Sequence, residues 1–278
     1  MVSNYTGSVE LKMIKITVAF LSVVLLMSCS PVDQPPAAVR ADLAPSGTLR
    51  AGINYGNPIL AQRDPATGDL RGITVDLSKE LARRIGVPVE LVPYDAAGKM
   101  TDALKTGAWD VAFLAVDPAR AEEISFTAPY LEIEGTYLVP AGSPIRTIAD
   151  VDREGVRIAA GAKSAYDLFL SRNLTRATIV RAPTALEAVD KFKTDKLEAV
   201  AGVRQALVSA AATIPGSRVL DERFMVIGQA AGVPKGRDAG ARYVREFIED
   251  AKASGFVAKA LKDSGVEDSA TIAPPARD

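Results

Sequence analysis

The chain has 278 residues, 48% of them hydrophobic, which is long enough for two lobes of ordinary size. Its formal net charge is −1, so we predict no nucleic-acid partner. It has no histidine and a single cysteine, which excludes an internal disulfide and leads us to predict no metal site and no cofactor.

Residues 1–28 have the organisation of an export signal. Two lysines precede an apolar run, 16–27, that is too short to span a bilayer comfortably. The run ends in Leu-Met-Ser-Cys, which resembles the bacterial lipobox and implies that Cys29 is lipidated. The alternative is that Cys29 is an ordinary thiol near a conventional cleavage site. The proline-rich segment that follows, 29–46 including the anchor, is predicted to be a stiff, extended tether.

Strands and helices alternate along the next part of the chain. A helix is predicted over 75–85, where Leu77, Leu81 and Ile85 share one face and Gly86 ends the pattern. A second helix is predicted over 98–106, and strands are predicted at 49–53, 89–92 and 111–115. This alternation predicts an α/β fold with parallel, doubly wound sheets.

A lone arginine follows the most apolar of these strands. Open α/β sheets bind ligands beyond the carboxyl ends of their strands, where this strand places Ala115 and then Arg120. An arginine side chain suits a carboxylate because its planar fork donates two parallel hydrogen bonds. Arg120 is therefore a candidate ligand-binding residue. The alternative is a solvated side chain paired with Glu122 or Glu123.

The second half repeats the alternation. Strands are predicted at 156–160, 178–182, 197–203 and 224–233, with helices after the first two and a long helix over 238–254. The junction Gly161–Ser164 lacks the glycines of a P-loop, so it predicts no nucleotide site. Ser164 has the position of a helix cap.

Two stretches resemble the family 3 extracellular solute-binding proteins, the receptors of polar amino-acid ABC importers. The matching residues are Gly107, Trp109-Asp110, Arg120, Phe126-Thr127-Ala128-Pro129-Tyr130 and the run from Gly72 to Leu81. The resemblance implies a two-lobed periplasmic-binding-protein fold, each lobe a sheet flanked by helices, joined by two hinge crossings. It implies lobe 1 at 47–138 plus 225–265, lobe 2 at 139–224, and a loose C-terminal tail at 266–278.

The resemblance also implies roles for particular residues. The loop with Tyr55 and Asn57 corresponds to one that covers the ligand with an aromatic ring, although Tyr55 packing on its own loop is an alternative. Ser164 matches a position whose hydroxyl and neighbouring amides hold the ligand's carboxylate, a role compatible with capping.

The sequence departs from the family pattern at two places. Gly202-Val203-Arg204 stands where amino-acid receptors place an aspartate for the α-ammonium group, and apolar residues replace the usual serines and threonines before Arg120. Burying an ammonium group without an anion is costly, which favours a carboxylate or dicarboxylate held by Arg120 and Arg204. Glu134 is the one nearby residue that would pair with an ammonium group. Its alternative role is as a charge on an exposed edge strand.

Together these features predict an exported, lipid-anchored, monomeric receptor at the periplasmic side or the cell surface. It would not be an enzyme, would close on a small anionic or zwitterionic ligand, and would deliver that ligand to an ABC permease. Membrane contact would be through the lipid anchor only. The alternatives are a periplasmic enzyme of the cyclohexadienyl dehydratase kind, with Glu132 or Glu134 as general acid, and a sensory receptor without a permease.

Overall fold

The computed structural model describes residues 1–2 and 35–277. The predicted export signal, the lipidation site Cys29 and the first part of the tether lie outside the described residues. Within the described ranges, no helix combines the length and the apolar character that crossing a membrane requires.

One continuous sheet organises residues 35–277. Its main path runs β4-β1-β5-β12-β7-β10-β8-β9, and β6, β11 and β13 pair beside this path. The strands are β1 (Leu49–Asn54), β4 (Val89–Tyr94), β5 (Val111–Ala115), β6 (Ile124–Phe126), β7 (Leu131–Val139), β8 (Arg157–Gly161), β9 (Thr178–Ala182), β10 (Ala199–Val203), β11 (Arg218–Val219), β12 (Met225–Pro234) and β13 (Thr271–Ile272). A separate small ribbon pairs β2 (Gln62–Arg63) with β3 (Leu70–Arg71).

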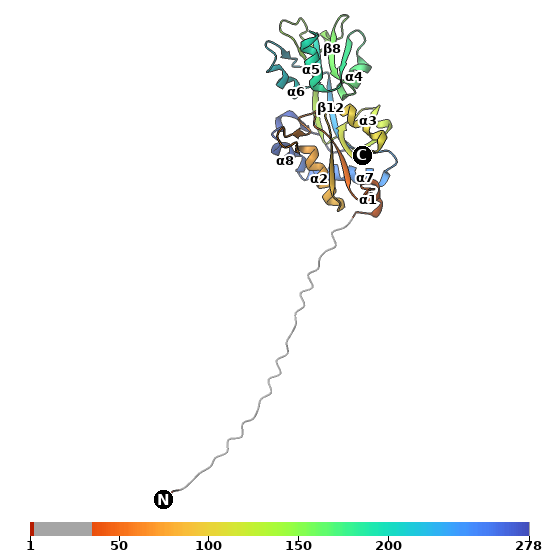
Figure 1. The fold of residues 1–278 in the computed structure, drawn as a ribbon, viewed down its shortest axis with the longest axis vertical. Helices are drawn as coiled ribbons and strands as arrows, with labels where there is room; N and C mark the ends of the chain where they lie inside the picture. The colour runs from red at the N-terminus through yellow and green to blue at the C-terminus, as the bar shows by residue number, and fades with distance from the viewer. Residues whose placement is uncertain (3–34, 278) are drawn as a thin grey trace. The chain divides into compact units, whose positions relative to one another are not determined.

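The helices divide into two groups at opposite ends of this sheet (Figure 1). Lobe 1 contains β1, β4 and β5 with α1 (Ala37–Leu43), α2 (Ile73–Ile85), α3 (Ala97–Ala103), α7 (Asp238–Ala253) and α8 (Phe256–Asp263). Lobe 2 contains β8, β9 and β10 with α4 (Ala165–Asn173), α5 (Ala185–Thr194) and α6 (Arg204–Ala211). The two-lobed α/β prediction is confirmed, while its exact residue boundaries stay a prediction.

Two long antiparallel strands connect the lobes. The first half of β7 pairs with β12, and its second half pairs with β10 of lobe 2. The second half of β12 pairs with β5 of lobe 1. Because both strands are hydrogen-bonded along their lengths, the connection between the lobes is a paired ribbon and not a pair of free linkers.

Amphipathic helices cover the sheet where the sequence pattern predicts them. On α2, Leu77, Leu81 and Ile85 are fully buried, and Gly86 ends the helix in the left-handed conformation at φ 70°. The helix begins two residues earlier than predicted because Gly72 allows a sharp entry into its first turn at φ 123°.

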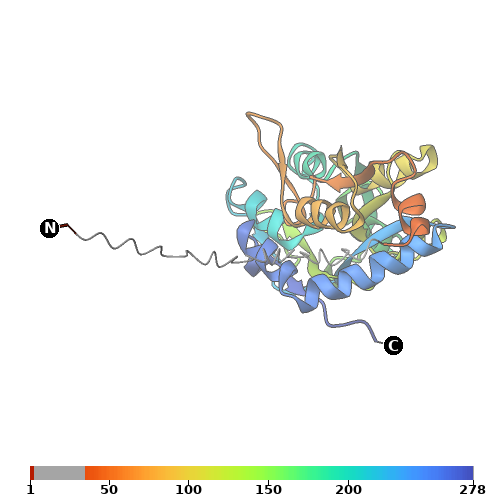
Figure 2. The same cartoon turned by 90° about the horizontal axis from the view of Figure 1, so that it is seen from below.

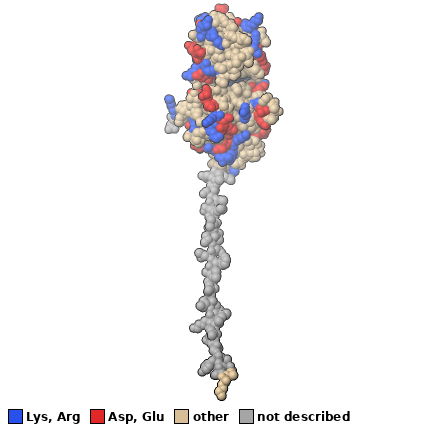
Figure 3. All heavy atoms as spheres, turned by 90° about the vertical axis from the view of Figure 1, so that its left-hand side faces the viewer, with Lys and Arg blue, Asp and Glu red and all other residues tan. Residues whose placement is uncertain are grey.

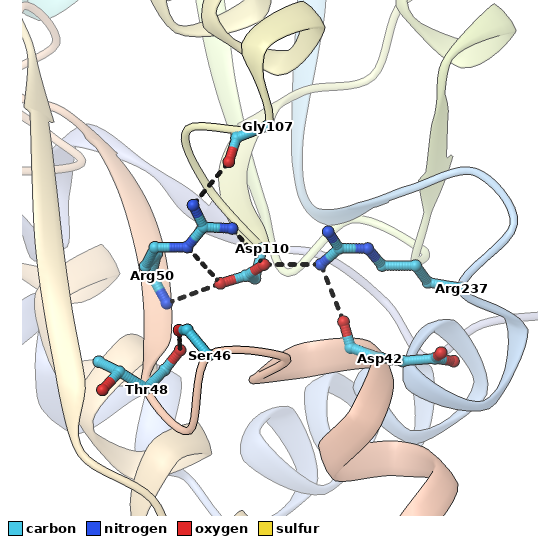
Figure 4. A network of polar contacts seen from close by, with 7 residues as sticks. All are labelled: Asp42, Ser46, Thr48, Arg50, Gly107, Asp110 and Arg237. Atoms are coloured by element: carbon cyan, nitrogen blue, oxygen red, sulfur yellow. Dashed lines mark hydrogen bonds and ion pairs between the residues drawn. The ribbon is translucent and has the colours of Figure 1, made fainter.

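The tryptophan–aspartate pair of the sequence motif is part of the core of lobe 1. Trp109 is fully buried and donates its indole N–H to the carbonyl of Met100. Asp110, whose side chain is 0% exposed, accepts hydrogen bonds from Arg50 and Arg237 at 2.7–2.9 Å (Figure 4). This part of the motif therefore builds the core of the lobe, and neither residue lines the cavity described below.

The prediction of an extended tether up to residue 46 is wrong for Ala37–Leu43, which forms helix α1. This helix lies beside α7 (Figure 2). Leu43 is fully buried, and the Asp42 carboxylate accepts a 2.9 Å hydrogen bond from the amide of Gly240. Arg237 adds a 2.8 Å bond to the carbonyl of Asp42. Contacts with the rest of lobe 1 thus stabilise a seven-residue helix that would be only marginally stable in isolation.

The prediction of a loose tail over 266–278 is also wrong for much of its described part. Strand β13 pairs with the start of β7, and Ala273 is buried. Lys252 on α7 donates to the carbonyl of Pro274 at 2.8 Å. The tail therefore covers an edge of the crossing ribbon.

Charged side chains of both signs are intermixed on the face shown in Figure 3. No broad region of one sign dominates this face, which agrees with the balanced formal charge.

Candidate functional site

A cavity lies where the carboxyl ends of strands from both lobes meet. Lobe 1 contributes the loops after β1 and β4 and the end of β5, and lobe 2 contributes the loops after β8, β9 and β10. Parallel strands bind ligands at this edge of an open sheet. The polar and charged side chains of the lining are Asn54, Asn57, Asp95, Arg120, Ser164, Tyr166, Thr184 and Gln229.

Arg120 is the buried cation of this cavity. It is 6% exposed, and it donates from Nη1 to the carbonyl of Ala115 and from Nη2 to the carbonyl of Lys163, both at 2.9 Å. Its Nε is buried without a hydrogen-bond partner. The partners of Arg120 are thus carbonyl oxygens and not a carboxylate, and its Nε–H has no partner among the described residues.

The charge of Arg120 persists at neutral pH. Burial lowers the pKa of Arg120 to about 10, and the nearby Asp117 opposes that shift. The carboxylate of Asp117 is itself occupied by Arg172 of lobe 2 at 2.7 Å. A protonated guanidinium with little compensation favours an anion in the cavity.

Two helix N-termini of lobe 2 also meet the cavity. The Ser164 hydroxyl caps α4 by accepting from the amide of Asp167 at 3.1 Å, and the Thr184 hydroxyl caps α5 by accepting from the amide of Glu187 at 3.1 Å. The positive ends of both helix dipoles therefore lie on the same wall. This wall adds to the electrostatic preference for a negatively charged group.

The structure brings four of the predicted site residues together. Asn57, Ala115, Arg120 and Ser164 all line the cavity. Tyr55, Glu134 and Arg204 are not among its lining residues.

Each of those three side chains has another contact. The ring of Tyr55 lies under the guanidinium of Arg63, with 5.4 Å from Cζ to the ring centroid. Glu134 accepts from Arg204 at 2.6 Å and from Arg223 at 2.7 Å. These hydrogen bonds, first from Arg223 and then from Arg204, lower the pKa of Glu134, which does not suit a general acid.

Sequence reasoning did not name five of the polar lining residues as site candidates: Asn54, Asp95, Tyr166, Thr184 and Gln229. The first two directly end or follow lobe 1 strands, so the rule that selected Arg120 applies to them as well. Gln229 is 3% exposed within the apolar, small-residue strand β12, and its Oε1 is buried without a partner. In the sequence, the signal for Gln229 is a single amide side chain within an otherwise apolar strand.

Within residues 1–2 and 35–277, no group of three or more histidine, cysteine, aspartate or glutamate side chains is arranged to hold a metal ion. The lining residues of the cavity provide hydrogen-bonding groups, two helix N-termini and one buried cation.

Residues 49–264 match the family model described as bacterial extracellular solute-binding proteins, family 3. The chain is 20% identical over 249 residues to an ABC transporter glutamine-binding protein of Bacillus subtilis (strain 168), covering 86% of this chain and 91% of that protein.

Two solved structures show the same fold. A mutant of ArgBP from T. maritima aligns with a TM-score of 0.70 at 20% identity, covering 82% of this chain and 99% of that one. The ancestral amino-acid-binding protein AncCDT-1, a precursor of cyclohexadienyl dehydratase, aligns with a TM-score of 0.67 at 22% identity, covering 79% and 95%.

Proposed function

Because the chain belongs to the bacterial extracellular solute-binding proteins, family 3, we propose that it is a receptor for a small carboxylate-bearing molecule that it delivers to an ABC importer. The observation that carries this proposal is the buried Arg120, which has an unpaired Nε in a cavity between two lobes. Amino acids and related organic acids both provide the carboxylate.

The proposed mechanism is a shift from an open to a closed arrangement of the lobes. A ligand favours closure only through contacts that the open form lacks, so it must contact both lobes. Arg120 follows a strand of lobe 1, whereas Ser164 and the N-terminus of α4 belong to lobe 2. A carboxylate between them would connect the two sides.

The remaining predictions belong to the same proposal. Cys29 would carry the lipid anchor of an exported, monomeric receptor, and the lobes would comprise 47–138 plus 225–265 and 139–224. The paired ribbon of β7 and β12 supports a hinge near these boundaries.

The Arg120→Met variant tests the proposal. A ligand present at 100 times its Kd stabilises a folded receptor by about 2.7 kcal/mol, which raises the melting temperature by several degrees. In a thermal-shift screen of amino acids and organic acids, we expect ligands to stabilise the wild type and to lose this effect in Arg120→Met. The matched control is Arg245→Met on the exposed side of α7, which should respond like the wild type. Undiminished stabilisation of Arg120→Met would remove Arg120 from the site.

A dehydratase-like enzyme is the second candidate, favoured by the structural similarity to AncCDT-1. Neither Glu132 nor Glu134 lines the cavity, which leaves that reaction without the predicted general acid. Incubation with prephenate or arogenate, followed by detection of the aromatic product, separates the two functions. Product formation at a rate abolished by Arg120→Met would favour the enzyme.

A further inference from the structure

Gln229 is the only residue of the described cavity lining that places a side-chain amide on the crossing strand β12. Its backbone is fully engaged, since it pairs with Ala115 of β5 and Leu131 of β7, and its carbonyl accepts from the amide of Tyr130 at 2.8 Å. The side chain is 3% exposed, and Oε1 has no hydrogen-bond partner. A buried amide oxygen without a partner is costly unless a ligand satisfies it.

The second unpaired polar atom of the cavity is close in the fold. Arg120 donates to the carbonyl of Ala115, the residue that pairs with Gln229 across the sheet. The free Nε of Arg120 and the free Oε1 of Gln229 therefore both belong to residues that contact the end of β5, Arg120 by a side-chain hydrogen bond and Gln229 by strand pairing. A ligand that satisfies both needs an anionic acceptor and, beside it, a group that donates a hydrogen bond to an amide oxygen.

The nature of that second group follows from the charges of the lining. Asp95 is the one carboxylate among the lining residues, and it forms an ion pair with Lys99 at 2.8 Å with 37% of its side chain exposed. An ammonium group next to Arg120 would consequently have only neutral oxygens as partners. A hydroxyl group can donate to the Gln229 Oε1 without adding a charge that needs a partner.

We infer that Gln229 is a specificity-determining residue that selects small hydroxy-carboxylates over the matching amino acids. This inference rests on the proposed receptor function, and it assigns the ligand class of the same cavity. The carboxylate binds at Arg120 and the helix N-termini, and the neighbouring hydroxyl binds the Gln229 amide.

Pairs of probes that differ only in this group test the inference. The purified receptor is titrated calorimetrically with lactate and alanine, glycerate and serine, malate and aspartate, and 2-hydroxyglutarate and glutamate. We expect at least one hydroxy acid to bind about tenfold more tightly than its amino acid, since a site built around a hydrogen-bonding group rejects a mismatched one strongly. Tighter binding of the amino acids, or binding of none of the hydroxy acids, overturns the inference.

Variants of Gln229 assign any preference to this residue. Gln229→Leu should remove the preference while raising the melting temperature of the unliganded receptor, because it deletes an unpaired buried amide. Gln229→Glu supplies the missing anion and should shift the preference toward the amino acid of the same pair. Gln205→Leu, an exposed position outside the cavity lining, is the matched control and should change neither quantity.

The outcomes separate the inference from the proposed function. If amino acids bind more tightly and their binding depends on Arg120, the receptor function stands and the assignment to Gln229 fails. If no probe binds and Arg120→Met changes nothing, the receptor function for small carboxylates fails as well. A preference for hydroxy acids that survives in both Gln229 variants also overturns the role of Gln229.

Discussion

At the scale of single residues, the carboxylate of Asp110 is the most completely buried charge described in lobe 1. Burial alone would raise its pKa, but hydrogen bonds from Arg50 and Arg237 outweigh burial, and the pKa of Asp110 is lowered. A lowered folded-state pKa means that the unfolded state binds more protons. The stability that ionised Asp110 contributes is therefore fully present above the pKa that an aspartate has in the unfolded state, about 4. This contribution is lost as the pH falls through the lower pKa of the folded state.

We expect Asp110→Asn to lower the free energy of unfolding at pH 7 by about 3 kcal/mol, because two partly buried arginines lose their shared anion. The variant should also flatten the loss of stability between pH 5 and roughly pH 3. Chemical denaturation across this pH range measures both effects. A loss below about 1 kcal/mol would contradict the structural role of Asp110.

The ends of strands point to several residues that line the cavity, and the ligand-binding role of these residues stays a prediction. Arg120, Ala115, Asn57 and Ser164 follow or end strands, and all four line the cavity. Arg204 also follows a strand, β10, yet it does not line the cavity, because its guanidinium pairs with Glu134, the predicted partner of a cationic ligand group. The local sequence does not reveal this pairing, because Glu134 and Arg204 are 70 residues apart in the chain. The register of β7 with β10 brings them together.

At the scale of elements, α1 shows why a prediction from local sequence fails for a short helix. Prolines before it and its brevity favour an extended chain, yet contacts with α7 determine its conformation. The longer amphipathic helices were predicted within a few residues because their periodicity alone specifies the buried face. A side-chain Cβ at Gly240 would meet Leu43 at 2.8 Å, so the close approach of α1 and α7 depends on this glycine.

We expect Leu43→Ala to lower the free energy of unfolding by about 2–4 kcal/mol, since Leu43 is fully buried between α1 and α7. The matched control is Leu186→Ala on α5, where the leucine is 73% exposed and the loss should stay within about 0.5 kcal/mol. Urea denaturation followed by circular dichroism compares them. Equal effects of the two substitutions would show that α1 contributes nothing to the stability of lobe 1.

At the scale of the whole molecule, polar contacts join the two lobes beside the cavity. Lys163 of lobe 2 pairs with Asp102 at 2.7 Å, and Arg172 pairs with the buried Asp117 at 2.7 Å. Lys163 adopts a left-handed φ of 56°, and its carbonyl accepts from Arg120. These contacts connect lobe 1 to lobe 2 across the cavity.

We expect the double variant Lys163→Met/Arg172→Met to have a larger radius of gyration than the wild type in the absence of ligand, measured by small-angle X-ray scattering. Both basic side chains are about half exposed, so high salt should weaken their ion pairs. The radius of gyration of the wild type should therefore also increase at high salt. The control, Lys191→Met/Lys193→Met, removes two pairs within α5 and should leave the radius unchanged. A double variant as compact as the wild type at every salt concentration would exclude these pairs as determinants of closure.

The hydrogen-bonded ladder between β7 and β12 also constrains how such a molecule can move. Since Met225–Gln229 pairs with Leu131–Gly135, a movement of one lobe against the other that keeps these pairs would have to bend or twist this two-stranded ribbon. Bending and twisting change different distances between the lobes. Two pairs of fluorophores, each with one dye on each lobe, would therefore be needed to tell them apart.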